Sequence, residues 1–180
     1  MPSSGLITHV TPEKLTQVLQ DAGYRVNQSE QNGVIQLLSA SQGIGYAVRF
    51  GNAGIESSTY IDFTYSCALR IQGSLPAGIT EVWNASRRFA RLSVQSDFLV
   101  MDLDVTVAAG VSLHHLRGNL ELWDRLLQEF IAYLRDYSQQ AARLQTETTA
   151  PEMSIDDEAH PAATAKKKST SLTEKRAADS

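Results

Sequence analysis

The residues best suited to chemistry are carboxylates in a stretch where polar and apolar residues alternate. Asp102 and Asp104 are two positions apart, so both project from one face of the expected strand, where Asp62 from another strand could join them. Paired carboxylates can transfer protons or hold a divalent cation. No further ligand follows at a recognisable spacing, so we interpret the pair as the polar row of a half-exposed strand. An enzyme that used both would need burial to drive their pKa values apart.

Histidine and cysteine give no stronger indication of a site. His114 and His115 are adjacent, hence about 100° apart around a helix, and cannot both face one metal as an i, i+4 pair can. Cys67 is the single cysteine and lies among apolar strand residues, which is typical of a buried thiol. We therefore expect no metal site and no intramolecular disulfide.

Sequence motifs for catalysis or cofactor binding are absent. Gly43-Ile44-Gly45 begins like a dinucleotide-binding fingerprint, but the third glycine and the following helix are missing. No G-x-S-x-G motif is present to position a nucleophilic serine. We expect no catalytic residues and no cofactor.

The charge pattern disfavours nucleic acid as a partner. The net charge is -4, and basic residues are scattered apart from a local group of arginines. A chain without a basic face is poorly suited to holding a phosphate backbone. The residues that we expect to form a protein-binding surface are Arg87, Arg88, Arg91, Asp102 and Asp104.

The apolar pattern indicates neither a membrane protein nor a secreted one. No window approaches the roughly 20 apolar residues that span a bilayer. The first residues, MPSSGLITHVTPEKL, have no basic region followed by a continuous apolar core, so we expect no signal peptide and a cytoplasmic location.

Local signals define the first half of the chain. Thr11-Pro12 is typical of a helix start and Gly23 of a helix stop, so residues 11–22 are predicted to be helical. A polar turn is expected at Gln28 to Gly33. Three strands then follow from short apolar or alternating runs: 34–38, 46–50 and 60–69, with a bend at 41–43 between the first two.

The second half repeats this alternation between helix and strand. A helix is predicted over residues 79–88, then strands over 89–95 and 99–107 with a turn at 95–97. Ser112 is predicted to cap the next helix. Beyond it, apolar residues recur every three or four positions, which predicts a long amphipathic helix that ends near residue 145. Trp83, Phe89 and Trp123 are expected to be core or dimer-contact aromatics.

The order of elements, α-β-β-β-α-β-β-α, predicts an α+β fold with an antiparallel sheet, because a parallel sheet would need a helix after each strand. Residues 11–145 form the predicted domain and residues 1–10 an N-terminal extension. Residues 146–180 have too few large apolar side chains to form a core, so we expect a disordered tail there.

Four stretches carry a resemblance to the YbjN-domain family of bacterial sensory transduction regulators: LTQVLQDAGYRV, WNASRRFARLSV, FLVMDLDV with the polar turn before it, and AAGVSLHHL. The resemblance covers roughly residues 10–137. It implies a fold like that of type III secretion chaperones, which are commonly dimeric, and it implies protein binding without catalysis. We therefore expect a homodimer that also binds another protein.

Three functions stay open from the sequence. The first is a regulator or chaperone-like protein that binds a protein partner. The second is a small-ligand sensor with a pocket between the sheet and the terminal helix. The third is an enzyme that uses Asp102 and Asp104.

Overall fold

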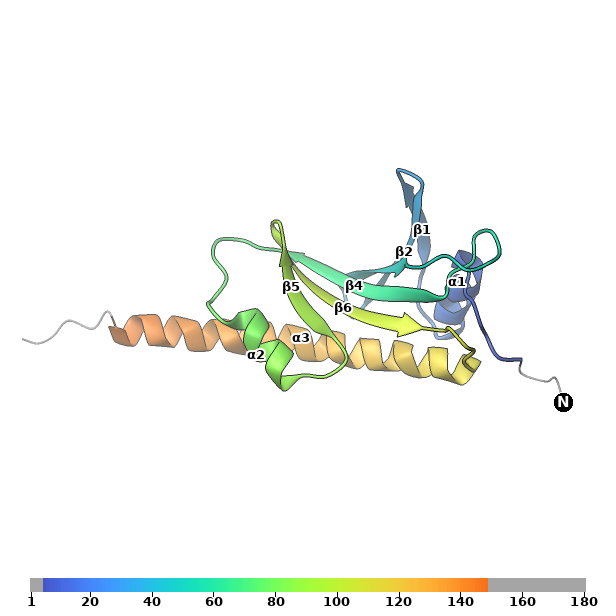
Figure 1. Ribbon diagram of the computed structural model, residues 1–180. Coiled ribbons are helices and arrows are strands. Elements are labelled where there is room, and N and C mark those ends of the chain that lie inside the picture. Colours follow the sequence, from blue (N-terminus) through green and yellow to red (C-terminus); the bar gives the residue numbers. More distant parts are fainter. Residues whose placement is uncertain (1–4, 149–180) are drawn as a thin grey trace, which may run out of the picture. The chain divides into compact units, whose positions relative to one another are not determined.

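The computed structural model describes residues 5–148, which form three helices and six strands (Figure 1). The predicted α+β class with an antiparallel sheet is confirmed. In chain order the elements are α1 (Pro12–Asp21), β1 (Asn27–Gln31), β2 (Val34–Ser41), β3 (Ile44–Phe50), β4 (Asp62–Arg70), α2 (Ile79–Ser86), β5 (Arg91–Gln95), β6 (Phe98–Thr106) and α3 (Leu113–Thr148).

All six strands form one antiparallel sheet in the order β1-β2-β3-β4-β6-β5. Strand β6 pairs with β4 along nine residues, from Asp62 opposite Thr106 to Arg70 opposite Phe98. The short strand β5 pairs with β6 on the side away from β4, so β1 and β5 are the two edge strands. This register puts side chains from β3, β4, β6 and β5 in rows across one face.

Strand β1 corrects the prediction of a polar turn from Gln28 to Gly33. Residues Asn27–Gln31 pair with β2, and only Asn32 and Gly33 form the turn, with φ values of 53° and 76°. Two successive positive φ values match the turn type that suits two-residue hairpins. The strand was missed because its sequence, NQSEQ, has no apolar residue, as befits an edge strand exposed on both faces.

The two short helices form in the predicted regions, although α2 ends at Ser86 and not at residue 88. The Thr11 hydroxyl accepts a hydrogen bond of 3.1 Å from the Lys14 N–H, which caps α1, and Gly23 follows with a φ of 91°. Helix α2 buries Trp83 completely, and the indole N–H donates to the Ala90 carbonyl at 3.0 Å. That bond fixes the start of the chain segment that leads into β5.

Helix α3 is the long helix predicted after Ser112, whose hydroxyl accepts a hydrogen bond of 3.1 Å from the His115 N–H. It has 36 residues and continues to Thr148, three residues past the predicted end. Its apolar stripe packs against the sheet and includes Leu116, Leu120, Trp123, Leu127 and Phe130. One helix therefore supplies one wall of the core along much of its length.

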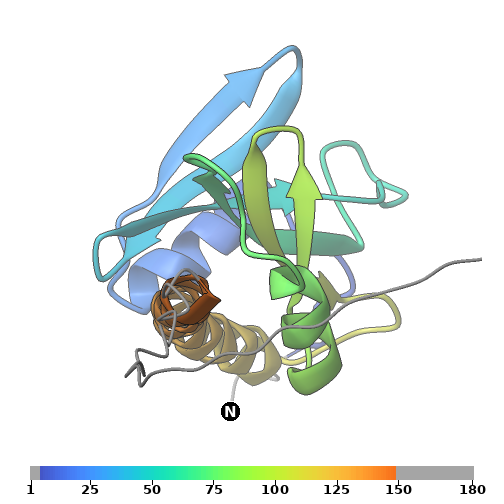
Figure 2. The same cartoon turned by 90° about the vertical axis from the view of Figure 1, so that its left-hand side faces the viewer.

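The helices cover one face of the sheet, which we call the inner face, and Figure 2 shows all three on the same side. Aromatic rings fill the space between this face and α3. Tyr65 on β4 stacks on Trp123 with ring centroids 5.5 Å apart, and Tyr46 on β3 meets the same indole edge-on at 5.7 Å. The Ser41 hydroxyl at the end of β2 also donates to the Asp124 carboxylate on α3.

Residues before α1 also pair with the domain. Ile7 forms an antiparallel bridge with Val111, and Val10 forms another with Tyr60. No helix among residues 5–148 is long and apolar enough to cross a membrane. The tail predicted to be disordered lies, from residue 149 onward, outside the described residues.

Candidate functional site

The candidate site is the sheet face opposite the helices, which we call the open face. Figure 1 shows the β1–β2 hairpin and the tip of β5 rising away from α3 at either side of this face. A hollow of about 490 Å³ lies over β2, β3 and β4, and its lining includes Leu38, Ala47, Arg49, Ser66 and Ala68. None of the helices in residues 5–148 covers this face (Figure 2).

Two arginine–aspartate pairs cross the open face. The Arg49 guanidinium on β3 lies 3.0 Å from the Asp102 carboxylate on β6, with β4 between the two strands. The Arg91 guanidinium on β5 lies 2.7 Å from the Asp104 carboxylate on β6. Because both acids are on β6, these two bonds link β3, β6 and β5 through side chains as well as through the backbone.

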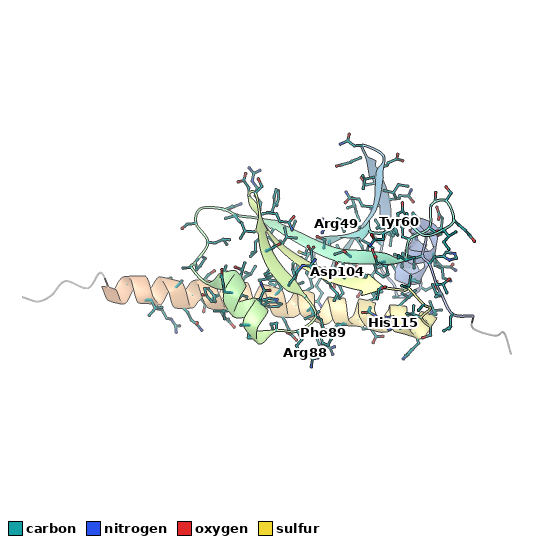
Figure 3. All side chains as sticks on the ribbon, viewed as in Figure 1. Arg49, Tyr60, Arg88, Phe89, Asp104 and His115 are labelled. Atoms are coloured by element: carbon teal, nitrogen blue, oxygen red, sulfur yellow. The ribbon has the colours of Figure 1, made fainter. Side chains whose placement is uncertain are left out.

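The two aspartates differ in their surroundings. Asp102 is a buried charged residue, only 5% exposed, so Arg49 neutralises a carboxylate that has lost most of its water. Asp104 is exposed and also accepts a hydrogen bond of 2.6 Å from the Thr64 hydroxyl. Arg49 and Asp104 both lie over the sheet in Figure 3. Asp102 is thus part of the floor of the open face, and Asp104 belongs to its surface.

The pKa of Asp104 is lowered from its ordinary value of 3.8. Partial burial acts in the opposite direction, but it is outweighed by the hydrogen bonds from Thr64 and Arg91 and by the positive charges of Arg91 and Arg49. A carboxylate held ionised in this way is suited to a fixed ion pair. It is poorly suited to donate a proton at neutral pH, as the acid–base hypothesis for Asp102 and Asp104 requires.

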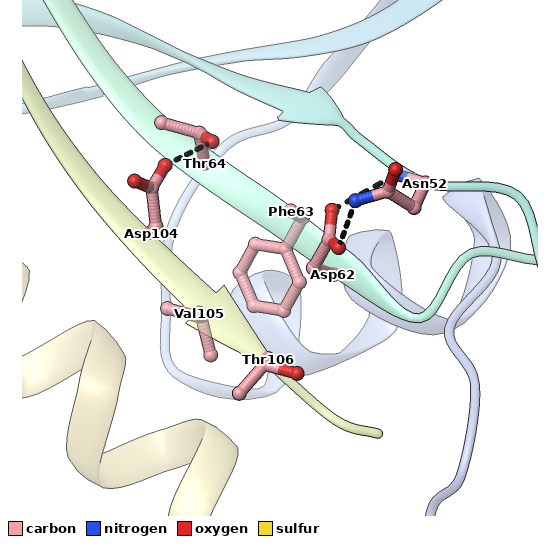
Figure 4. Close-up of a pocket in the computed structure, with 7 residues that line it drawn as sticks. All are labelled: Asn52, Asp62, Phe63, Thr64, Asp104, Val105 and Thr106. Atoms are coloured by element: carbon pink, nitrogen blue, oxygen red, sulfur yellow. Dashed lines mark hydrogen bonds between the residues drawn. The ribbon is translucent and has the colours of Figure 1, made fainter.

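Asp62 lies near this network but has partners of its own. Its carboxylate accepts hydrogen bonds from the backbone N–H of Asn52 at 2.9 Å and from the side-chain amide of Asn52 at 2.6 Å (Figure 4). Asp62 and Asp104 line the same hollow of about 400 Å³. Within residues 5–148 there is no group of three or more His, Cys, Asp or Glu that could hold a metal ion.

The two histidines lie at the surface, and the cysteine is buried as the sequence predicted. His114 and His115 are both exposed in the first turn of α3, and the His115 ring lies 3.0 Å from the side-chain amide of Asn119. Cys67 is fully buried on the inner face, and burial raises the pKa of its thiol to about 11. A thiol with so high a pKa is a weak nucleophile.

The five residues predicted to form a binding surface fall into two groups. Arg91, Asp102 and Asp104 meet on the open face. Arg87 lies at the end of α2, where its guanidinium is 5.5 Å from the centre of the Trp83 ring and 3.5 Å from the Glu129 carboxylate on α3.

Arg88 belongs to the same turn as Arg87 and is placed over the ring of Phe89. Sequence reasoning missed Arg49, although it was detectable: it occupies the polar row of β3, opposite to Tyr46, Val48 and Phe50. Arg49 and Arg91 therefore belong to the open face, whereas Arg87 and Arg88 belong to the turn between α2 and β5.

A smaller hollow of about 250 Å³ lies where β4, α2 and α3 meet. Most of the side chains that line it are apolar. They include Leu69, Ile71, Leu75, Ile79, Leu99 and Leu134. Of the hollows described within residues 5–148, it corresponds best to the pocket between sheet and terminal helix that a ligand sensor would need.

Comparison with known proteins gives one match. A protein-family model, YbjN, described as "Putative bacterial sensory transduction regulator", matches residues 11–136. The matched region begins at the cap of α1 and ends within α3, so it includes the whole sheet. Neither the curated proteins nor the solved structures contain a significant match.

Proposed function

Because this chain belongs to the YbjN family of bacterial regulators, we propose that it is a non-enzymatic regulator that binds another protein in the cytoplasm. The open face is the observation that supports this role. It is a wide sheet face on which apolar side chains, such as those of Leu38 and Ala68, lie beside two arginine–aspartate pairs. Protein–protein interfaces usually combine apolar contacts with polar groups that form hydrogen bonds.

The chemistry of the same face also supports binding over catalysis. Its two aspartates are engaged by arginines, and the pKa of Asp104 is lowered, whereas a general acid needs a raised one. Apolar and charged side chains lie next to one another on this face, so a partner would gain both apolar contacts and polar contacts there. A chaperone-like role would use the same surface.

Photo-crosslinking in the bacterium of origin tests this function. A photoreactive amino acid at Ala68, on the floor of the open face, should link the chain to a discrete partner protein that mass spectrometry can identify. The matched site is Ala22, an exposed alanine at the end of α1 on the helical side, and it should give no such product. Ala68→Arg should abolish capture of the same partner by the tagged full-length chain.

Two results would reject the protein-binding role. One is a crosslinking pattern at Ala68 that does not differ from that at Ala22. The other is that the purified chain turns over a substrate and that Asp102→Asn abolishes this activity. That result would support the enzyme hypothesis.

We further propose that the chain self-associates. Val94 and Phe98, on either side of the turn between β5 and β6, are exposed apolar residues and support such a contact, whereas the apolar stripe of α3 is covered by the sheet of the same chain. A monomer mass from light scattering at micromolar concentration would contradict the proposed homodimer.

Small-ligand sensing is the alternative function, and the apolar hollow beside Leu134 is the observation in its favour. Its volume of about 250 Å³ is below the range of roughly 300–1,000 Å³ that is typical of ligand sites. A thermal shift on addition of a fatty acid that disappears in Leu134→Trp would support sensing. Identical shifts in both proteins would exclude this hollow as the ligand site.

A further inference from the structure

The turn between α2 and β5 contains a backbone conformation that is unusual for the residue that adopts it. Phe89 has a φ of 75°, and the N–H of Ala90 donates to the carbonyl of Arg88 at 3.0 Å, which makes a γ-turn centred on Phe89. Such a turn with positive φ is rare and strained. The other non-glycine residues with positive φ in residues 5–148 are small or polar, and all lie in turns or loops; they are Asn32, Gln42, Ser58, Ser96 and Ala109.

Hydrogen bonds hold the chain in place on both sides of this γ-turn. Before it, the Arg87 N–H donates to the Trp83 carbonyl at 2.8 Å. After it, the Trp83 indole donates to the Ala90 carbonyl at 3.0 Å. The fully buried Trp83 thus anchors both ends of the turn, and the surrounding structure imposes the strained geometry on Phe89.

The Phe89 ring gains little from burial in return for this strain. It is 65% exposed, which makes it one of the most exposed large apolar side chains in residues 5–148. Glycine would adopt the same φ without strain and would lose little packing. A bulky aromatic at an exposed and strained position lowers stability, so its benefit must lie outside the folding of the domain.

Arg88 gives the exposed ring a charged neighbour. Its guanidinium carbon lies 5.2 Å from the centre of the Phe89 ring, within the range of a cation–π contact. Figure 3 shows the two residues together at the turn. Arg87 and Arg91 are matched by Glu129 and Asp104, whereas no carboxylate within residues 5–148 lies within salt-bridge distance of Arg88.

We propose that Arg88 and Phe89 form an anchor that binds an acidic segment of a protein partner, with a carboxylate on Arg88 and an aliphatic side chain on the Phe89 ring. Unmatched positive charge selects a carboxylate, which a guanidinium can bind with two parallel hydrogen bonds. The exposed ring selects an apolar group, and the cation–π contact strengthens once a partner excludes water. The anchor rests on the proposed function, because it names the chemistry of one part of the partner.

Peptide display on the full-length chain tests this anchor without knowledge of the natural partner. The probe is a library of random dodecapeptides, selected on immobilised wild-type protein and then measured by fluorescence anisotropy. The enriched peptides should carry Asp or Glu beside Leu, Ile, Val or Phe. Phe89→Gly and Arg88→Glu should each weaken their binding by at least about tenfold, as expected for loss of an interface hot spot.

The matched control is Ile55→Ala, which removes an exposed apolar side chain from the loop before β4 and should leave peptide binding unchanged. Phe89→Gly also separates a binding role from a structural one. We expect its melting temperature to equal or exceed that of the wild type, because the strain is relieved.

Several results would overturn the anchor. They are a library that yields no enriched peptide, peptides that lack acidic residues, peptides that bind Phe89→Gly as tightly as the wild type, and a melting temperature of Phe89→Gly more than roughly 4 °C below the wild type. Crosslinking at Ala68 distinguishes failure of the anchor from failure of the proposed protein-binding function. If Ala68→Arg loses the partner while Phe89→Gly retains it, only the anchor is wrong.

Discussion

The Arg49 guanidinium on β3 donates a hydrogen bond of 3.0 Å to the buried carboxylate of Asp102 on β6, across the strand that separates them. The side chain of Asp102 is 7% exposed, whereas that of Asp104 in the neighbouring pair is 52% exposed. The two pairs share a face and a chemistry and differ mainly in burial. They therefore form a matched comparison.

We predict that Arg49→Met lowers the free energy of unfolding by about 1–3 kcal/mol, because it leaves a buried carboxylate without its charged partner. Arg91→Met should cost less than about 1 kcal/mol, since water can solvate Asp104 once the arginine is gone. Urea denaturation of both variants measures the difference. Equal losses would show that burial of Asp102 does not determine the contribution of the pair.

Acid titration should reveal the ion pair of Asp104. Its pKa in the folded protein is below 3.8, so the folded state holds the ionised form more strongly than the unfolded state does. The stabilisation is complete above the unfolded pKa, near pH 4, and is lost as the pH falls through the lower folded pKa. As the pH falls below about 4, Asp104→Asn should therefore lose less stability than the wild type.

Denaturation curves at several pH values give the measurement. Thr64→Val offers a second check, because loss of the hydroxyl that donates to Asp104 should raise the carboxyl pKa toward its ordinary value. An NMR titration with a midpoint at or above 3.8 in the wild type would contradict the assigned role of these hydrogen bonds.

The sequence predicted the parts of this fold that depend on local pattern. In β4, Phe63, Tyr65 and Cys67 are buried on the inner face, and in β6 the alternation of Met101 and Leu103 with Asp102 and Asp104 separates the two faces as expected. A period of two residues is enough to assign these faces. Strand β1 has no such period, and its pairing depends on the turn and on the neighbouring strand.

The site was predictable only in part, for a related reason. Spacing along β6 put Asp102 and Asp104 on one face, but their partners Arg49 and Arg91 come from strands on either side. Which arginine faces which aspartate depends on the order of strands in the sheet, and no local pattern encodes that order. The conformation of Phe89 was equally hidden, because a positive φ at a phenylalanine has no sequence signal.

Cys67 should be protected from thiol reagents for as long as the domain is folded. The side chain is fully buried, and a pKa of about 11 leaves about one thiol in a thousand ionised at pH 8. We expect a disulfide reagent to label it at the rate of unfolding, faster in urea. The control is Ala68→Cys in a Cys67→Ser background, which places a thiol on the open face and should react at once. Rapid labelling of native Cys67 would contradict its burial.

A side chain from α2 covers the free edge of β5 at one residue. The Asn84 amide donates to the Leu92 carbonyl at 2.9 Å, and its oxygen accepts from the Leu92 N–H at 2.8 Å. Asn84 thereby takes the place of a neighbouring strand and blocks the backbone groups that another chain could use for pairing.

We predict that Asn84→Ala lowers the free energy of unfolding by about 1 kcal/mol. Two hydrogen bonds of about 1 kcal/mol each are lost. The higher helix propensity of alanine returns up to about 0.7 kcal/mol, so the net effect is smaller than the two bonds together.

The control is Asn119→Ala on α3, whose amide bonds to the His115 carbonyl and ring within its own helix, and which should change stability little. Light scattering should show more association for Asn84→Ala, because β5 then offers Leu92 for pairing. If Asn84→Ala has the same stability and the same mass in solution as the wild type, Asn84 does not protect the edge of β5.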